Sequence, residues 1–183
     1  GSQVGNHGGY PRSVSRRRQT CISDSTDVHQ QRVLQEELLS SQTRFQQLLE
    51  TLPQLAWTAR PDGGVSYYNQ RWFDFTGASF DDLQNWGWEQ FIHPDDLTYT
   101  MQRWQHSLAT GEPYEAEQRW RGQHGDYRWF LGRAEAVRDQ AGAVSLWMGA
   151  NTDIHDFKQV QQQLEAQNAR LLRTNDDLDN FVY

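Results

Sequence analysis

The sequence contains a single cysteine, Cys21, among its 183 residues. No disulfide can form within one chain, and such sparing use of cysteine is typical of proteins from a reducing compartment. The sequence also lacks any apolar run near the ~20 residues that a membrane-spanning helix needs, and it has no signal-peptide pattern. We therefore expect a cytoplasmic location and no membrane contact by this chain.

An excess of basic residues is missing as well. The chain has 17 Lys and Arg against 24 Asp and Glu, so that its net charge is −7. A nucleic-acid-binding domain usually carries a clear basic excess, and we therefore expect no nucleic-acid partner. The basic cluster Arg16–Arg18 lies in a leader rich in Gly, Ser and Gln, residues 1–27, which we predict to be disordered.

Residues 28–52 have the spacing of an amphipathic helix that ends before Pro53. Two series of side chains, each with steps of seven, interleave by four and three into a heptad seam. The series are Leu34, Ser41 and Leu48, and Leu38, Phe45 and Leu52. Two interpretations stay open: a helix that lies on its own domain, and a short coiled coil at a dimer axis.

The region between this helix and the C-terminal one, residues 53–153, holds all eight tryptophans. Asn69 and Gly77 are predicted to bound a first short helix, and Pro94 to start a longer one. The fold class is therefore α+β, with one antiparallel sheet and helices on one face. The patterns predict strands at 55–60, 65–68, 114–121, 127–137 and 143–152, and helices at 70–76, 79–83 and 94–109.

Residues 154–183 are predicted to form a second long helix. Leu or Phe recurs every seven residues, and polar residues fill most of the complementary seam positions. Polar residues in a seam fix the register and lower the stability of a coiled coil. A homodimeric coiled coil is one interpretation, and a solvated single helix is the other. The two series are Phe157, Leu164, Leu171 and Leu178, and Gln161, Asn168, Asn175 and Val182.

A set of short motifs runs in order along the middle of the chain: Arg44–Pro53, Trp57, Pro61–Gly63, Tyr68–Trp72, Thr76–Gly77, Gly87–Trp88, His93–Asp96, Trp104, Gly111–Glu115, Arg119–Arg121, Gly125–Phe130 and Gly149–Ile154. Because these motifs occur in order and close together over residues 45–160, we identify a resemblance. The chain resembles a PAS domain of the subclass with the PAC-type C-terminal half. The resemblance implies a five-stranded antiparallel sheet flanked by helices, and a sensory or protein-interaction role.

The PAS family usually ends its last strand in Asp-Ile-Thr, and here the run is Asp153, Ile154 and His155. The resemblance implies that Asp153 ties the strand end to the helix start through a hydrogen bond or an Arg pair. With Gly149 on the same strand, these residues form the predicted signal relay. Residues 171–183 resemble the lead-in to the phospho-acceptor helix of bacterial sensor histidine kinases. This likeness implies kinase domains in a parent chain, outside the present sequence.

A small-molecule pocket would lie between the inner face of the predicted sheet and the helices. The alternative is a packed aromatic core without a pocket, because each large ring fills volume and buries about 150–250 Å². Buried indole N–H groups need partners, which a polar ligand or water can supply. The candidate wall residues are Trp57, Phe73, Phe80, Trp88, Met101, Trp104, Trp120 and Trp147.

No cofactor is predicted, and the sequence leaves open whether an unidentified small ligand binds. A haem ligand would have to be His106, but the apolar face of helix 94–109 is centred on residues 97, 101, 104 and 108. At about 100° per residue, His106 lies on the opposite side. A flavin adduct would need a core cysteine, and Cys21 lies outside the core.

Metal and catalytic sites are not expected either. His93, Asp95 and Asp96 are predicted to cap the long helix rather than to bind a metal, because no further ligands follow at suitable spacing. Acidic residues of the core region lie in turns, at helix starts or on polar strand faces. The sequence has no Gly-rich phosphate loop and no nucleophile elbow. We therefore expect this chain not to be an enzyme.

Two functions remain. In the first, the chain is a sensory and dimerisation module that relays a signal through its C-terminal helix to a histidine kinase output, in two-component signal transduction. In the second, it is a ligand-free protein-interaction and dimerisation module with a closed aromatic core.

Overall fold

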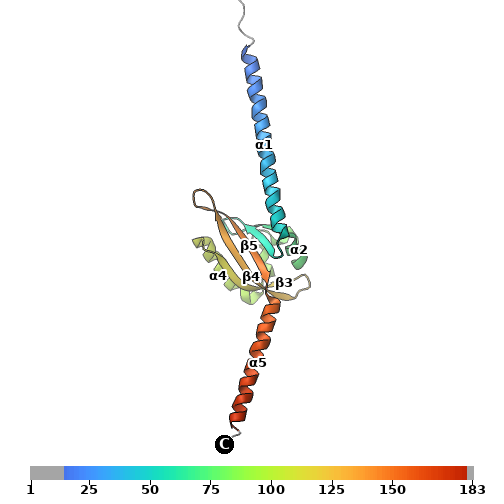
Figure 1. Ribbon diagram of the computed structural model, residues 1–183, viewed down its shortest axis with the longest axis vertical. Helices are drawn as coiled ribbons and strands as arrows, with labels where there is room; N and C mark the ends of the chain where they lie inside the picture. The colour runs from blue at the N-terminus through green and yellow to red at the C-terminus, as the bar shows by residue number, and fades with distance from the viewer. Residues whose placement is uncertain (1–14, 181–183) are drawn as a thin grey trace, which may run out of the picture. The chain divides into compact units, whose positions relative to one another are not determined.

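The computed structural model describes the backbone of residues 15–180 and the side chains of residues 28–173. The chain divides into two units, residues 1–46 and 47–183. Figure 1 shows the elements in order: α1 (Ser15–Thr51), β1 (Leu55–Ala59), β2 (Val65–Tyr68), α2 (Gln70–Thr76), α3 (Phe80–Leu83), η1 (Gly87–Phe91), α4 (Pro94–Thr110), β3 (Tyr114–Arg121), β4 (Tyr127–Arg138), β5 (Val144–Asp153) and α5 (His155–Asn180).

Helix α1 begins at Ser15, earlier than the predicted start at Val28. Residues 15–27 were predicted to be disordered, and this prediction is wrong for their backbone, which is helical. The physical reason is that neither Gly nor Pro, the two strong helix breakers, occurs in the chain between Pro11 and Pro53. The rest of the predicted leader, residues 1–14, lies outside the described residues.

The five strands form one antiparallel sheet in the order β2-β1-β5-β4-β3. The last strand of the sequence, β5, is therefore the central one. Gly149 pairs with Trp57 of β1 on one side and with Ala134 of β4 on the other. Because β5 leads into α5, the centre of the sheet is connected directly to the C-terminal helix. The predicted fold class and the five strands are confirmed.

One face of the sheet and the helices enclose the core. On β3 the residues Tyr114, Ala116, Gln118 and Trp120 are buried, as their alternation predicted. On α4 the side chain of Trp104 is buried, and the predicted neighbours on its face pack against the core. His106 lies on the far side of this helix, exposed and 2.9 Å from a carboxylate oxygen of Glu112. Its predicted orientation is therefore confirmed.

Asn69 differs from its predicted role. It precedes α2 as expected, but its side chain makes no capping hydrogen bond. The amide is instead fully buried, accepts a hydrogen bond from the backbone N–H of Ala56, and donates to the carbonyls of Leu49 and Gln54. Burial of an amide is tolerated when its donors and acceptor are satisfied. Asn69 therefore joins the last turn of α1, the first residues of β1 and the start of α2.

The start of α4 is fastened to β3. The imidazole Nδ1 of His93 accepts a hydrogen bond from the backbone N–H of Asp95 and so caps the helix. The carboxylate of Asp96 accepts three hydrogen bonds from Arg119, at 2.9 Å from its backbone N–H, 2.9 Å from Nε and 2.7 Å from Nη2. Among the described residues no group of three or more His, Cys, Asp or Glu is placed to hold a metal.

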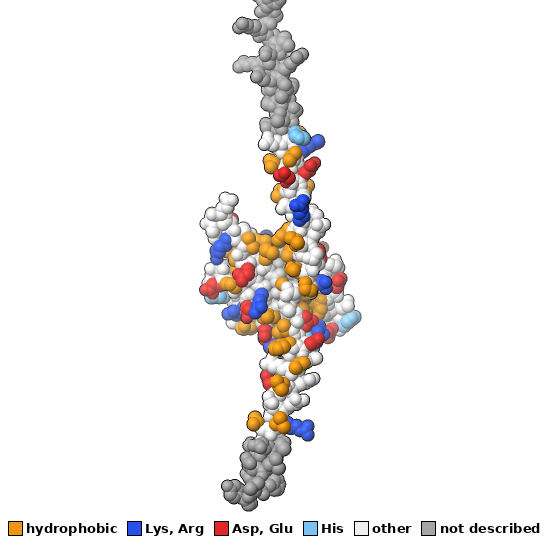
Figure 2. Space-filling view, in the orientation of Figure 1, with side chains coloured by type: hydrophobic (Ala, Val, Ile, Leu, Met, Phe, Trp, Pro, Cys, Tyr) orange, Lys and Arg blue, Asp and Glu red, His pale blue; other side chains and the backbone are white. Residues whose placement is uncertain are grey.

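The helix α5 leaves its hydrophobic seam in contact with solvent, as Figure 2 shows for its described part. Phe157, Leu164 and Leu171 are each more than half exposed in the single chain. The side chains of Asn175 and Leu178 lie outside the described residues. Within residues 15–180, no helix combines the length and the apolar character that a bilayer span requires. Pairing of the seam across a dimer stays a prediction.

The same holds for the seam of α1. Leu38 is 69% exposed, and Leu34 and Leu48 are also largely exposed, whereas Phe45 is 37% exposed. Apolar side chains at heptad spacing are typical of a helix that pairs with another helix. This seam, too, remains a predicted dimer contact.

The ion pair between Asp96 and Arg119 generates a prediction for stability. Burial would raise the pKa of Asp96, but the hydrogen bonds and charge of Arg119 outweigh burial and lower that pKa overall. The pair therefore stabilises the fold above the unfolded-state pKa, and the contribution is lost as the pH falls through the lower folded-state pKa. We expect Asp96→Asn to lower the free energy of unfolding at pH 7 by about 1.5–3 kcal/mol.

Urea unfolding at pH 7 and at about pH 3 measures this effect, and the difference from the unmodified chain should shrink at the lower pH. Asp95→Asn is the matched control, because the Asp95 carboxylate is mostly exposed and lies 3.7 Å from Arg119. Its expected loss is below about 0.5 kcal/mol. Equal losses in the two variants would contradict the assignment.

Candidate functional site

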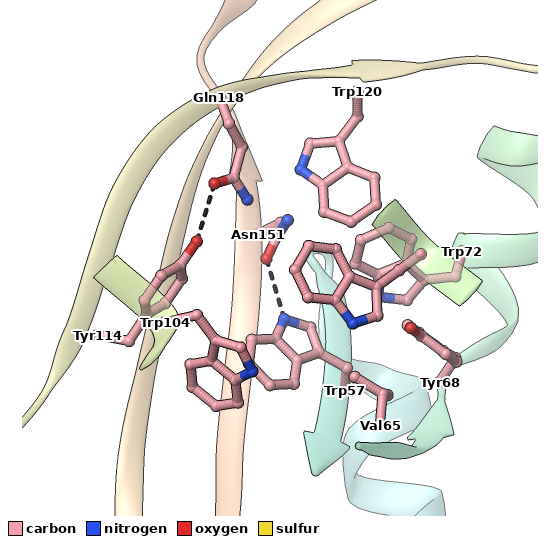
Figure 3. A pocket seen from close by; sticks show the side chains of 10 residues that line it. Trp57, Val65, Tyr68, Trp72, Trp104, Tyr114, Gln118, Trp120 and Asn151 are labelled. Atoms are coloured by element: carbon pink, nitrogen blue, oxygen red, sulfur yellow. Dashed lines mark hydrogen bonds between the residues drawn. The ribbon is translucent and has the colours of Figure 1, made fainter. Parts of the chain in front are cut away.

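A small cavity of about 30 Å³ lies inside the core, between the sheet and the helices. A cavity of roughly 10–15 Å³ is already enough to hold one water molecule, so this cavity has room for water. Side chains from the sheet, from α2, from η1 and from α4 contribute to its wall (Figure 3). The lining residues are Trp57, Val65, Tyr68, Trp72, Trp88, Trp104, Tyr114, Gln118, Trp120 and Asn151.

Four of the predicted wall residues line this cavity: Trp57, Trp88, Trp104 and Trp120. The other four do not. Trp147 is buried in the core with its ring 5.2 Å from that of Trp104, and Phe73 and Met101 are partly buried against the same core. Phe80 is 41% exposed, and its ring centroid lies 6.5 Å from that of Tyr68.

Sequence reasoning missed six of the lining residues as a site: Val65, Tyr68, Trp72, Tyr114, Gln118 and Asn151. A signal existed for two of them. Tyr114 and Gln118 share the alternating face of β3 with Trp120, so that strand periodicity already placed them inside. No local pattern distinguishes Asn151 from an ordinary strand residue, because its role depends on contacts with β1 and β4.

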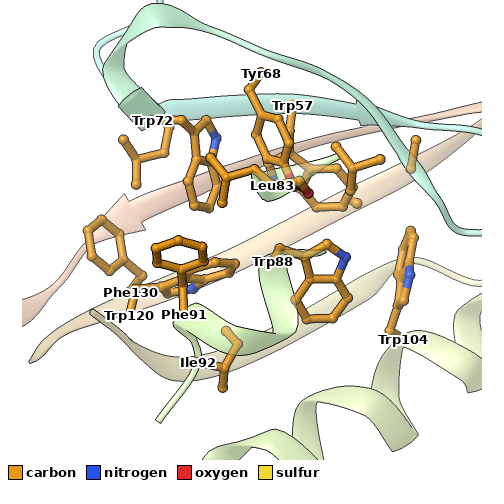
Figure 4. Packing of buried hydrophobic residues seen from close by; sticks show 14 of the residues in the cluster. Trp57, Tyr68, Trp72, Leu83, Trp88, Phe91, Ile92, Trp104, Trp120 and Phe130 are labelled. Atoms are coloured by element: carbon orange, nitrogen blue, oxygen red, sulfur yellow. Dashed lines mark hydrogen bonds between the residues drawn. The ribbon is translucent and has the colours of Figure 1, made fainter. Parts of the chain in front are cut away.

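Packed rings fix the walls of the cavity (Figure 4). Trp72 and Trp120 meet edge to face at 4.7 Å between ring centroids. Trp57 and Trp104 meet in the same way at 5.6 Å, and Trp104 and Tyr114 at 5.3 Å. Such edge-to-face contacts are the favoured geometry of aromatic pairs and add to the free energy of burial.

Two amides add to the polar part of the lining, beside the tyrosine hydroxyls and the indole N–H groups (Figure 3). The Asn151 amide oxygen accepts a hydrogen bond from the Trp57 indole at 2.9 Å. The Gln118 amide oxygen accepts from the hydroxyls of Tyr114, at 2.8 Å, and Thr100, at 3.1 Å. Burial raises the pKa of the Tyr114 phenol, so that this hydroxyl keeps its proton and remains a donor.

Trp57 lies directly over the backbone of β5. It pairs with Gly149 in the sheet, and a Cβ atom at Gly149 would overlap the Trp57 ring. Gly149, a predicted relay residue, is therefore the position that lets the indole reach Asn151 two residues further along the strand. Through this contact the cavity wall and the central strand are packed as one structure.

The second part of the candidate site is the junction between β5 and α5. One carboxylate oxygen of Asp153 accepts a hydrogen bond from Arg128 Nε at 2.7 Å, and the other accepts from the backbone N–H of His155 at 2.9 Å. The hydrogen bond with Asp153 raises the pKa of Arg128 further above its already high value. Asp153 thus makes both contacts that the family resemblance implies, an Arg pair and a hydrogen bond to the helix start.

Contacts from β3 and β4 hold the first turn of α5. The backbone N–H of Ile154 donates to the carbonyl of Trp129 at 2.9 Å, and that of Trp129 donates to His155 Nδ1 at 3.4 Å. The imidazole of His155 thus makes a contact where the family usually has a Thr hydroxyl. Lys158 Nζ lies 2.5 Å from a carboxylate oxygen of Glu117 and 5.4 Å from the centroid of the Trp129 ring.

The contact of Trp57 with Gly149 generates a second prediction. In Gly149→Ala the new methyl group must displace the Trp57 ring, and such overpacking costs about 1–3 kcal/mol of the free energy of unfolding. Gly64→Ala is the matched control, because its methyl group meets chiefly the flexible guanidinium end of Arg60 and the side chain of Asp62. Its expected effect is within about 0.5 kcal/mol. Thermal or urea unfolding measures both, and similar losses would show that the ring contact is not responsible.

Comparisons with known proteins agree with this architecture. Residues 65–151 match the family model described as PAS fold. A sensory box histidine kinase/response regulator from Burkholderia thailandensis superposes with a TM-score of 0.55 at 26% identity, over 71% of this chain and 98% of that one.

Curated proteins give related matches. The chain is 33% identical over 162 residues to the uncharacterized protein y4lL of Sinorhizobium fredii, covering 88% of this chain and 20% of that protein. It is 29% identical over 164 residues to the peroxide stress-activated histidine kinase mak1 of Schizosaccharomyces pombe, covering 81% of this chain and 10% of the kinase. The chain therefore spans a fifth or less of the length of these relatives. Residues 65–151 belong to the PAS family, and the sheet and helices described above form a PAS domain.

Proposed function

We propose that this PAS domain is a sensory and dimerisation module that relays a signal through α5 to a histidine kinase output in two-component signal transduction. The observation that carries the proposal is the course of β5. This central strand lines the core cavity at Asn151 and reaches the start of α5 at Asp153, only two residues later. The relatedness to segments of histidine kinases supports the choice of output.

The relay begins at the hydrogen bond between Trp57 and Asn151. A change in the core that moves either side chain also moves β5, because Trp57 packs on Gly149 of the same strand. The displacement then reaches the contacts of Asp153, Ile154 and His155 that set the direction of α5. A helix held by a few hydrogen bonds at its first turn has discrete alternative arrangements, which a signal can select.

The output side of the proposal is a homodimer. In α5 the exposed seam residues Phe157, Leu164 and Leu171 pair with a second copy of the chain, and the seam of α1 does the same. The polar seam residues Asn168 and Asn175 lower the stability of the pair and keep two arrangements close in energy. The partners are thus a second chain and the kinase domains of a longer parent protein, and we place this activity in the cytoplasm.

The alternative is a ligand-free interaction and dimerisation module, which the small volume of the cavity favours. A cavity of about 30 Å³ is far below the roughly 300–1,000 Å³ of ordinary ligand pockets. In this alternative the core is closed, and the domain serves to space and pair the flanking helices.

Native mass spectrometry of the chain, followed by a denatured run, distinguishes these functions. A dimer with additional mass that is lost on denaturation is the result expected for a ligand-sensing module. A dimer of bare chains favours the closed-core alternative. A bare monomer contradicts dimerisation through the flanking helices of this chain.

The polar seam generates a further prediction. We expect the double variant Asn168→Leu with Asn175→Leu to strengthen the dimer, because apolar side chains then replace buried amides, and to lock the activity of the parent kinase. Sedimentation equilibrium measures the dissociation constant, and autophosphorylation of the parent protein measures the output. Gln162→Leu with Ala169→Leu is the matched control, with the same spacing but off the seam. Unchanged dimerisation together with unchanged signalling would rule out this seam as the output element.

A further inference from the structure

Four buried hydrogen-bond donors lack a partner among the described residues, and all four belong to side chains that line the core cavity. They are the indole nitrogens of Trp72, Trp88 and Trp120 and the amide nitrogen of Asn151. Each of these residues is at most 6% exposed. An unpaired buried donor costs about 1–3 kcal/mol, so that a cluster of them around one cavity indicates a missing acceptor.

Chemistry fixes the direction of the Asn151 amide. The Trp57 indole can only donate, so that the atom of Asn151 that faces it at 2.9 Å must be the oxygen. The Asn151 nitrogen therefore turns away from Trp57. Figure 3 shows it directed toward the same space as the amide nitrogen of Gln118 and the indole nitrogen of Trp120.

Gly132 of β4 lies beneath this space. A Cβ atom built on Gly132 would be 3.2 Å from the amide nitrogen of Gln118 and 3.3 Å from the amide oxygen of Asn151. The two amides thus approach the same glycine from neighbouring strands, because Gly132 pairs with Asn151 on β5 and Ala116 on β3. A side chain at this position would crowd both amides and the Tyr114 ring, so that glycine is what lets the amides lie this close to β4.

A water molecule satisfies this lining only in part. It accepts at most two hydrogen bonds, whereas four donors are unpaired, and its own two protons need acceptors. The Gln118 oxygen already accepts two hydrogen bonds, which leaves to water the second lone pair of the Asn151 oxygen and the lone pairs of the Tyr68 and Tyr114 hydroxyls. A group that accepts without donating satisfies the free N–H groups and adds no unpaired proton.

An anion matches it poorly as well. No Lys, Arg or His is among the lining residues, and most of the wall is aromatic. The same burial raises the pKa of Tyr68 and of Tyr114, which means that the environment disfavours a negative charge. A carboxylate or phosphate would lose its hydration there without a cation to pair with.

We propose that the core cavity binds a small neutral molecule that accepts hydrogen bonds without donating them, such as a ketone, an aldehyde or an ether, with its oxygen among the nitrogens of Trp120, Asn151 and Gln118. This inference rests on the proposed sensory function and names the ligand class of that site. Even a small ketone exceeds a cavity of about 30 Å³, so that binding moves a ring of the wall. Trp88 is carried by η1, a single short 3-10 helix.

The indole N–H resonances of the chain provide the test, because each tryptophan gives its own signal in a ¹H–¹⁵N spectrum. The probes are acetone, 2-propanol and isobutene, which share a shape and differ in the group presented to the donors. We expect acetone to shift the signal of Trp120, the indole beside the proposed oxygen, saturably and more strongly than 2-propanol does. The indole of Trp104, which already donates to the Gly63 carbonyl, serves as the internal reference.

Two variants locate the effect. Trp120→Phe keeps an aromatic ring but removes one free donor, and it should weaken acetone binding by about 2- to 10-fold. Trp104→Phe, which removes an indole already bonded to Gly63, should change it less than about twofold. If Trp120→Phe fails to fold, Gly132→Ala serves in its place, because its methyl group narrows the space beside the donors and should also weaken binding.

Two results would overturn the inference. One is the absence of any saturable shift with acetone, which would mean that the cavity is dry or holds water alone. The other is an equal response to acetone and isobutene, which would mean that the cavity selects volume rather than an acceptor. Because binding is observed without dimer or kinase, failure here leaves the relay through α5 and its own test unaffected.

Discussion

The hydrogen bond from the Trp57 indole to the Asn151 amide oxygen is the constraint on which the rest of the domain depends. It joins β1 to the central strand β5, and it requires Gly149 beneath the indole ring. It also sets the direction of the Asn151 amide nitrogen, which then faces the cavity instead of a protein partner. A single contact thus ties the packing of the aromatic core to the strand that continues into α5.

The core combines dense ring packing with polar groups that the protein itself leaves unsatisfied. Edge-to-face contacts among the tryptophans stabilise the fold, whereas the unpaired donors of Trp72, Trp88 and Trp120 lower its stability. Conflicts of this kind between stability and local chemistry are expected at functional sites. The core cavity is therefore a more specific candidate for signal input than its small volume alone indicates.

The junction differs from the core, because its polar groups are paired. Asp153 is bound by Arg128 and by the first N–H of α5, and Lys158 reaches Glu117 on β3. These ion pairs are partly exposed, so that solvent weakens each of them. In the proposed relay, their geometry sets the direction of the helix, and small changes in β5 alter it. We therefore propose that this cluster of contacts contributes orientation rather than stability.

Local sequence patterns determined the elements and their order. Proline and glycine positions bounded α4, alternation assigned the inner face of β3, and helical spacing directed His106 away from the core. Tertiary structure decided what the same residues do. Asn69 looks like a helix cap, but it is drawn into the core by three backbone partners from distant segments. Asn151 and Gln118 became site residues because pairing of β5 and β3 with β4 brings them to Gly132. The sequence encodes periodicity within a segment, whereas strand order and side-chain partners arise only when distant segments pack.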